Sequence, residues 1–132
     1  MKKKIVDANV IIRYLAEDDL DKAERAENLF LEAEPGELRI PDMVMAEIVW
    51  VLGSYYELEK KEILEKLKAI LAFEKLDFNR DILEKAIDIF AMNDVEFIDC
   101  YLSALSQEKG FSEIYTFDDD FNQIEGVERG TP

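Results

Sequence analysis

Apolar positions divide the chain into short runs and longer stretches with helical spacing, and the two kinds alternate from one end to the other. The short runs lie between turn signals and predict strands at residues 4–6, 38–40, 76–78 and 114–117, with a short edge strand at 127–129. The longer stretches predict helices at residues 10–15, 20–33, 42–55, 59–73, 82–90 and 97–110. This alternation predicts an α/β fold with a central parallel sheet covered by helices on both faces.

Turn-forming and capping residues mark where several helices begin and end. Asn9 precedes Val10 and is expected to cap the first helix, Pro35-Gly36 stops the second, and Gly110 ends the last. The chain has 132 residues, of which 48% are hydrophobic, and this suits one compact core. We therefore expect residues 1–132 to form a single domain.

The predicted helix at residues 59–73 carries an apolar stripe that includes Ile63, Leu67 and Ile70. Such a stripe is typical of a core face or of a seam between subunits rather than of a ligand site. Trp50 and Tyr55 add aromatic surface on the preceding helix. One thin sheet offers little room to cover all of this surface, so we expect a homodimer.

The charge of the chain restricts its chemistry. Lysine and arginine number 16 against 31 acidic residues, which gives a net charge of -15 and excludes the broad basic surface of a nonspecific DNA-binding protein. Histidine is absent, and with it the usual proton shuttle at neutral pH and the commonest zinc ligand. Catalysis must rest on carboxylates, and a nucleic acid must be held through metal or through a few cations such as Arg13.

The only cysteine, Cys100, cannot form a disulfide within the chain. We expect it to be a small buried residue rather than a nucleophile, because no histidine could activate it. Lys2-Lys3-Lys4 before apolar residues is like the start of a secretory signal, but Asp7 interrupts the apolar run and Arg13 ends it. No stretch is long enough to span a bilayer. We therefore expect a cytoplasmic protein with no membrane contact.

Four carboxylates stand at the ends of predicted strands or in predicted helices. Asp7 and Asp118 each follow a strand, Asp99 falls in the first turn of the last helix, and Glu47 lies at the edge of an apolar helix face and is expected to point inward. Carboxylates ~4 Å apart repel by about 4 kcal/mol per pair at an effective dielectric near 20, so such a cluster requires a cation. Hard divalent cations with oxygen ligands fit best.

Each carboxylate alone also has a purely structural explanation. Asp99 could serve the helix dipole, Asp118-Asp119-Asp120 could be a solvated helix cap, and Glu47 could complete a polar rim. The metal hypothesis therefore depends on the combination of these positions and not on any single one.

Four segments, in this order, resemble the PIN domain, and within it the VapC toxins of toxin-antitoxin pairs. They are Ile5-Val6-Asp7-Ala8-Asn9-Val10-Ile11, Pro41-Asp42 followed by Ala46-Glu47, Phe97-Ile98-Asp99-Cys100-Tyr101-Leu102 with Ala104-Leu105, and Thr116-Phe117-Asp118-Asp119-Asp120-Phe121. The resemblance covers essentially the entire chain. The chain departs from the family at Cys100, where alanine is more usual, and in its strong acidity.

The resemblance implies a PIN-like three-layer domain whose central parallel sheet has the strand order 3-2-1-4-5 and is flanked by helices. It also implies an endoribonuclease that depends on Mg²⁺ or Mn²⁺ and cleaves RNA phosphodiester bonds with a metal-activated water, as a toxin with a small antitoxin partner. By the same resemblance, Asp7, Glu47, Asp99 and Asp118 match the acidic quartet that binds metal and carries catalysis, and Asn9, Thr116 and Asp120 match supporting positions.

Two other interpretations stay open at this point. A Mg²⁺-dependent phosphotransfer domain is less favoured, because a haloacid-dehalogenase-like phosphatase needs an aspartate where Asn9 stands, and a response-regulator receiver needs an acidic pair after the first strand and a lysine after the last. A PIN-like dimeric binding protein without catalysis is expected to have lost a quartet member, and all four are present.

Overall fold

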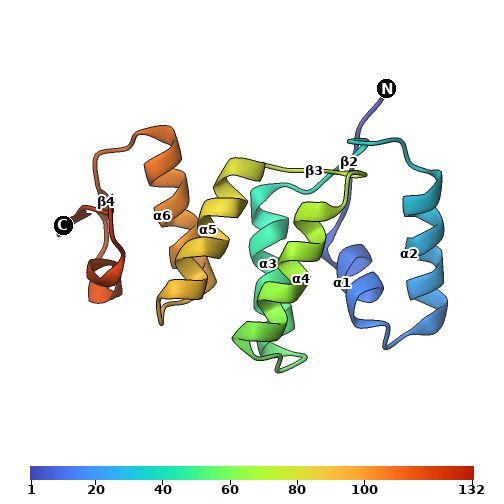
Figure 1. Ribbon diagram of the computed structural model, residues 1–132, viewed down its shortest axis with the longest axis horizontal. Helices are drawn as coiled ribbons and strands as arrows, with labels where there is room; N and C mark the ends of the chain where they lie inside the picture. Colours follow the sequence, from blue (N-terminus) through green and yellow to red (C-terminus); the bar gives the residue numbers. More distant parts are fainter. The chain divides into compact units, whose positions relative to one another are not determined.

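The computed structural model describes residues 1–132, with six α-helices, one 3₁₀ helix and five short strands (Figure 1). The chain forms two compact units, Met1–Asn79 and Arg80–Pro132. The single domain over residues 1–132 stays a prediction. None of the six helices is both long and apolar enough to cross a membrane.

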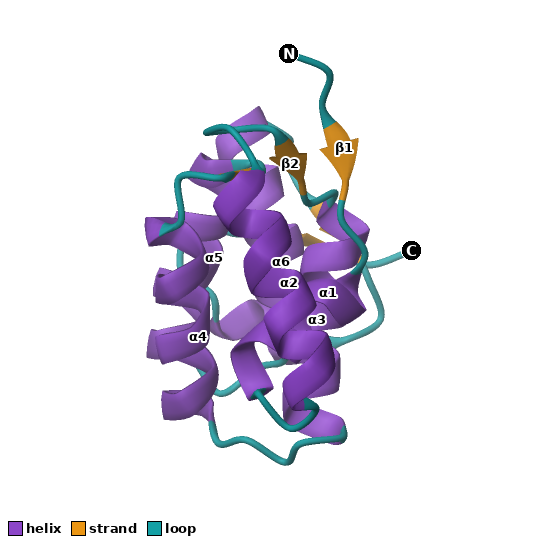
Figure 2. Ribbon diagram, turned by 90° about the vertical axis from the view of Figure 1, so that its right-hand side faces the viewer, coloured by secondary structure: helices purple, strands orange, loops and turns teal.

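The first unit combines a parallel sheet with four helices. The strands β1 (Lys4–Ile5), β2 (Leu38–Arg39) and β3 (Leu76–Asp77) lie in the order β1-β2-β3. Both pairs are parallel, and Figure 2 shows β1 and β2 running in the same direction. The helices are α1 (Ala8–Ala16), α2 (Leu20–Glu32), α3 (Asp42–Ser54) and α4 (Lys60–Ala72). Helix α1 packs against α2 and α3, and α4 packs against α3 (Figure 1).

Aspartates cap the first two helices. The carboxylate of Asp7 accepts a hydrogen bond of 2.8 Å from the amide of Ala8. The prediction that Asn9 caps this helix is wrong, because α1 begins before it and Asn9 lies in its first turn. Asp19 caps α2 through the amide of Lys22 at 3.1 Å. Aspartate and asparagine cap about equally well, so the sequence could not decide between neighbouring candidates.

The core of the first unit is aliphatic, with an aromatic group at one end. Fully buried side chains include Ile12, Leu38, Ile40, Met45, Ile48, Leu52 and Leu67. Phe30 is the centre of the aromatic group, with its ring centroid 4.9 Å from that of Tyr14 and 5.1 Å from that of Phe73. Both ring pairs meet edge to face, the arrangement that aromatic quadrupoles favour.

The apolar stripe of α4 belongs to the core. Ile63, Leu67 and Ile70 are all buried within the chain, so the hypothesis that they form a seam between subunits is wrong. Trp50 and Tyr55 are different, since they are 68% and 74% exposed. The homodimer therefore stays a prediction that rests on the exposed aromatic residues alone.

The second unit consists of two packed helices and a short parallel strand pair. Helices α5 (Arg80–Met92) and α6 (Phe97–Lys109) lie side by side (Figure 1). Strand β4 (Ile114–Tyr115) pairs with β5 (Arg129–Gly130), and the 3₁₀ helix η1 (Asp119–Gln123) lies between them in the chain. Gly110 ends α6 with a φ of 73°, a left-handed conformation that glycine adopts without strain. Cys100 is buried, as expected.

The observed strand pairs confirm a mixed α/β fold with parallel pairing. The order β1-β2-β3 and the pair β4-β5 correspond to the two halves of the expected order 3-2-1-4-5. The step that joins these halves, β1 beside β4, stays a prediction. The carboxyl ends of β1 and β4 nevertheless carry Asp7 and Asp118 as the sequence indicated.

Candidate metal centre

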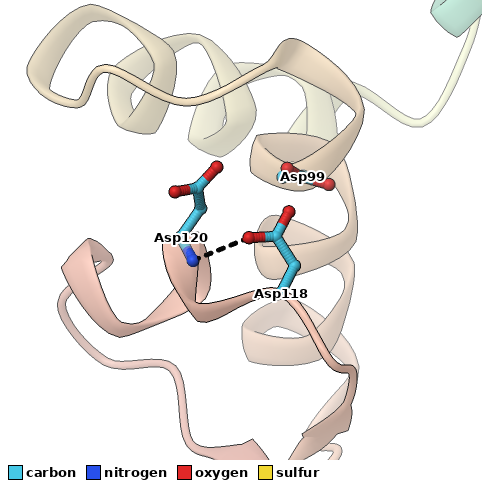
Figure 3. Close-up of side chains that lie close together, drawn as sticks. All are labelled: Asp99, Asp118 and Asp120. Atoms are coloured by element: carbon cyan, nitrogen blue, oxygen red, sulfur yellow. Dashed lines mark hydrogen bonds between the residues drawn. The ribbon is translucent and has the colours of Figure 1, made fainter.

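Three aspartates of the second unit bring their carboxylates together. One oxygen from each of Asp99, Asp118 and Asp120 lies within 4.8 Å of the other two (Figure 3). Figure 3 shows the side chains of Asp118 and Asp120 extending towards the first turn of α6, from which Asp99 projects. We call these three residues the aspartate cluster.

The turn after β4 is fixed by short-range hydrogen bonds. The carboxylate of Asp118 caps η1 and accepts a bond of 2.9 Å from the amide of Asp120, drawn as the dashed line in Figure 3. The amide of Asp118 in turn donates to the hydroxyl oxygen of Thr116 at 3.0 Å. Side chains of this kind bind backbone groups two residues away and so hold a tight turn. Thr116 therefore positions Asp118 through the backbone.

Asp99 is held by the backbone of α6. Glu96 is the residue before the first turn of this helix, and its carbonyl accepts a hydrogen bond of 3.1 Å from the amide of Asp99. The hydroxyl of the buried Ser103 donates to the carbonyl of Asp99 at 2.8 Å. The helix thus engages both backbone groups of Asp99 and leaves its carboxylate to the cluster. Sequence reasoning did not single out Ser103, although a serine four residues after an aspartate in a helix is a recognisable spacing.

The cluster carries negative charge that no cation in the chain balances. Partial burial, and after it the charges of Asp118, Glu96 and Asp120, raise the pKa of Asp99 above its ordinary value. The neighbouring charge of Asp118 is the main cause of the raised pKa of Asp120. None of the chain's salt bridges involves a member of the cluster. The repulsion is therefore not relieved by lysine or arginine.

The donor set fits a hard divalent cation. Three carboxylates offer oxygen ligands within reach of one ion, and no histidine or thiolate that would favour a softer metal is present among them. Asp120 enters the cluster as a full member, whereas the sequence suggested only a supporting position for it. The signal that could have found it is its spacing of two from Asp118 across a tight turn.

The other predicted site residues lie in the first unit, and all three are exposed. Asp7 caps α1, Asn9 follows in the first turn of that helix, and Glu47 lies on α3. The prediction that Glu47 faces inward is wrong, because the buried positions of α3 nearby are Val44 and Ile48. That Asp7 and Glu47 complete one site with the aspartate cluster stays a prediction.

The fold and the cluster together define an α/β protein with a candidate acidic metal centre. Comparison with known families agrees, since the model of the PIN domain matches residues 4–127. The chain therefore belongs to the PIN domain family.

Two known proteins are similar along nearly the whole chain. A VapC ribonuclease of Aquifex aeolicus (strain VF5) is 27% identical over 124 residues, which cover 92% of this chain and 91% of that protein. A crystal structure is known of VapC20 of Mycobacterium tuberculosis, a toxin that cleaves the sarcin-ricin loop. Its sequence is 19% identical to this chain. That comparison covers 97% of this chain and 98% of the other, with a TM-score of 0.43.

Proposed function

We propose that the protein is a VapC-type endoribonuclease that cleaves RNA phosphodiester bonds and depends on Mg²⁺ or Mn²⁺. The observation that carries this proposal is the aspartate cluster, which has no basic partner and lies in a chain of the PIN family. The similarity to a VapC ribonuclease supports RNA as the substrate.

In this proposal Asp7 and Asp99 would hold the metal ion, and Glu47 and Asp118 would serve as further ligands or as bases that orient the attacking water, with Asp120 close by. A bound divalent ion lowers the pKa of a water molecule and stabilises the charge that develops on the phosphate. A carboxylate oxygen of Glu47 or Asp118 accepts the proton of the attacking water. This scheme needs no histidine, which agrees with the composition.

The supporting residues keep these carboxylates in place. Thr116 fixes the backbone of Asp118, as its hydrogen bond indicates. Asn9 lies two residues after Asp7 on α1, and its amide side chain is suited to donate to a carboxylate or to a bound water. Both positions belong to the proposed site without contributing negative charge to it.

The test is cleavage of a mixed RNA pool by the purified protein, in Mn²⁺ and in EDTA. We expect cleavage only with the ion, and we expect Asp7→Asn and Asp99→Asn to lower the rate about hundredfold or more. Asp119→Asn is the matched control, because this neighbouring aspartate lies outside the cluster. Equal cleavage in EDTA would contradict the metal dependence.

We further propose a cytoplasmic protein whose partner is a small antitoxin that places an arginine-bearing segment across the acidic site. Guanidinium groups pair with carboxylates through two parallel hydrogen bonds and would occupy the place of the cation. An arginine-rich peptide should therefore compete with Mn²⁺ and should bind Asp99→Asn more weakly than the wild type. A peptide that binds both proteins equally would contradict this partner.

A further inference from the structure

The surface of the first unit contains a basic hollow between α1 and α2. It has a volume of about 410 Å³. Its polar lining consists of Asn9 and Arg13 from α1 and Lys22 and Arg25 from α2. No carboxylate lines it, although acidic residues outnumber basic ones by 31 to 16 in the chain. Three basic residues therefore lie close together in a chain whose net charge is negative.

A second hollow between the same helices has the opposite charge. It is lined by Glu17, Glu24 and Glu27, together with apolar residues of α2. The two hollows thus differ in charge, with cations lining one and carboxylates lining the other. The cationic lining favours a ligand with negative charge for the basic hollow.

Two of the three cations are available to a ligand. Arg13 is engaged by Asp18, with its nitrogen 3.3 Å from the carboxylate. Arg25 lies 3.8 Å from Asp21, but this pair is largely exposed and contributes little. The salt bridges of the chain leave Lys22 without a carboxylate partner. Arg25 and Lys22 can therefore turn towards an anion without breaking a strong contact.

The basic hollow begins next to a proposed metal ligand. Asn9 lies two residues after Asp7, and Arg13 lies six residues after it on the same helix. Six residues of α-helix span about 9 Å, since each residue rises 1.5 Å. A stacked nucleic acid strand advances about 3.4 Å per nucleotide, so the rise along α1 from Asp7 to Arg13 corresponds to about three nucleotides.

We propose that this basic hollow binds the phosphate backbone of single-stranded RNA beside the cleavage site, with Lys22 and Arg25 as its main contacts. The inference rests on the proposed ribonuclease function. It also accounts for how a chain with a net charge of -15 can hold a polyanion. The hollow supplies attraction to phosphate without sequence selection, because phosphate contacts carry no base information.

The test measures binding of a short fluorescent single-stranded RNA in EDTA, where no cleavage takes place. The variants are Lys22→Glu with Arg25→Glu, and the milder Lys22→Gln with Arg25→Gln. Lys68→Glu is the control, because Lys68 is an exposed lysine of α4, remote in sequence and outside the hollow. Circular dichroism checks that the helices are retained.

We expect the charge-reversing pair to weaken RNA binding about tenfold and Lys68→Glu to weaken it less than about twofold. The slope of log affinity against log salt should fall by about 0.7 for each phosphate that the variant no longer neutralises. The glutamine pair and Lys68→Glu change the net charge by the same amount. Equal weakening of RNA binding in these two variants would overturn the assignment, since only net charge would matter. Displacement of the RNA by polyglutamate at equal charge concentration would also overturn it, because a peptide would then serve as well.

Cleavage in Mn²⁺ separates this inference from the proposed function. If the hollow holds substrate, the Gln variants should raise KM and leave kcat near the wild-type value, the pattern of weakened substrate binding. Unchanged KM with normal cleavage would overturn the role of the hollow and leave the ribonuclease intact. Absence of cleavage in the wild type would contradict the proposed function, while the binding assay would still report on the hollow.

Discussion

The amide of Asp120 donates a hydrogen bond of 2.9 Å to the carboxylate of Asp118, so one member of the aspartate cluster fixes the position of another. The bond closes the turn that follows β4 and directs both carboxylates towards Asp99 on α6 (Figure 3). This hydrogen bond thus holds two negatively charged side chains close together although they repel each other.

Removal of charge from the cluster should not destabilise the protein. In EDTA, Asp99→Asn should leave the free energy of unfolding unchanged or raise it by up to about 1 kcal/mol, because one source of repulsion is removed. Urea unfolding followed by circular dichroism measures this, with Asp119→Asn as the control. A decrease of more than about 1 kcal/mol would show that Asp99 has a structural role.

The hydroxyl of Thr116 should matter for activity more than for folding. Thr116→Val keeps the shape of the side chain but leaves the amide of Asp118 without its acceptor. A lost hydrogen bond is worth about 1 kcal/mol. If this free energy is lost in the transition state, the cleavage rate falls about fivefold. Thr116→Ser restores the hydroxyl and should restore RNA cleavage. Equal rates for the valine and serine variants would contradict this role.

Asp77, on β3, should make the stability of the protein depend on pH. A hydrogen bond from Lys3 at 2.8 Å, together with Arg39 on β2 and against the opposing effect of partial burial, holds the pKa of Asp77 below its ordinary value. A carboxylate with a depressed pKa stabilises the fold above its unfolded pKa, and this contribution is lost as pH falls through the folded pKa.

We therefore expect Asp77→Asn to lower the free energy of unfolding by about 1 kcal/mol at pH 7, a value that allows for the partial exposure of Asp77. In strong acid the substitution should leave the free energy of unfolding unchanged. Chemical unfolding between pH 7 and pH 2 measures the two curves, which should converge as pH falls. Asp88→Asn on α5 is a control with an exposed aspartate. Curves that stay parallel would contradict the linkage.

The homodimer prediction now depends on exposed aromatic surface. Trp50→Lys should convert a dimer into a monomer in sedimentation at micromolar concentration, because a charge in the centre of an apolar interface is costly. Phe111→Lys changes a residue that is 63% exposed in the second unit and should leave the dimer intact. A wild-type monomer at that concentration would contradict the prediction outright.

The sequence predicted the elements well because apolar periodicity reports them directly. Each predicted strand and helix has a counterpart, and the carboxylates at Asp7, Asp99 and Asp118 lie at the element ends where they were expected. The failures concern the position of a cap and the direction of a side chain. Asn9 was misplaced because Asp7 is an equally good cap, and Glu47 is exposed although it borders an apolar face.

Other features could not be predicted from the sequence, because they depend on distances across the fold. Asp120 belongs to the aspartate cluster because of the turn after β4, and the sequence pattern does not predict the hydrogen bonds of that turn. Lys22 and Arg25 fit a solvated helix equally well in the sequence, and only the packing of α2 on α1 brings them to Arg13. Periodicity specifies which face of a helix is buried but not which neighbour covers it.

We propose that Asp7 and Asp99 hold the same metal ion. Isothermal titration with Mn²⁺ of the wild type, Asp7→Asn, Asp99→Asn and the control Asp119→Asn tests this proposal. We predict that Asp7→Asn and Asp99→Asn each weaken Mn²⁺ binding by about tenfold or more, while Asp119→Asn stays within about threefold of the wild type. Wild-type Mn²⁺ affinity in Asp7→Asn, with affinity abolished in Asp99→Asn, would contradict a site shared between the two residues.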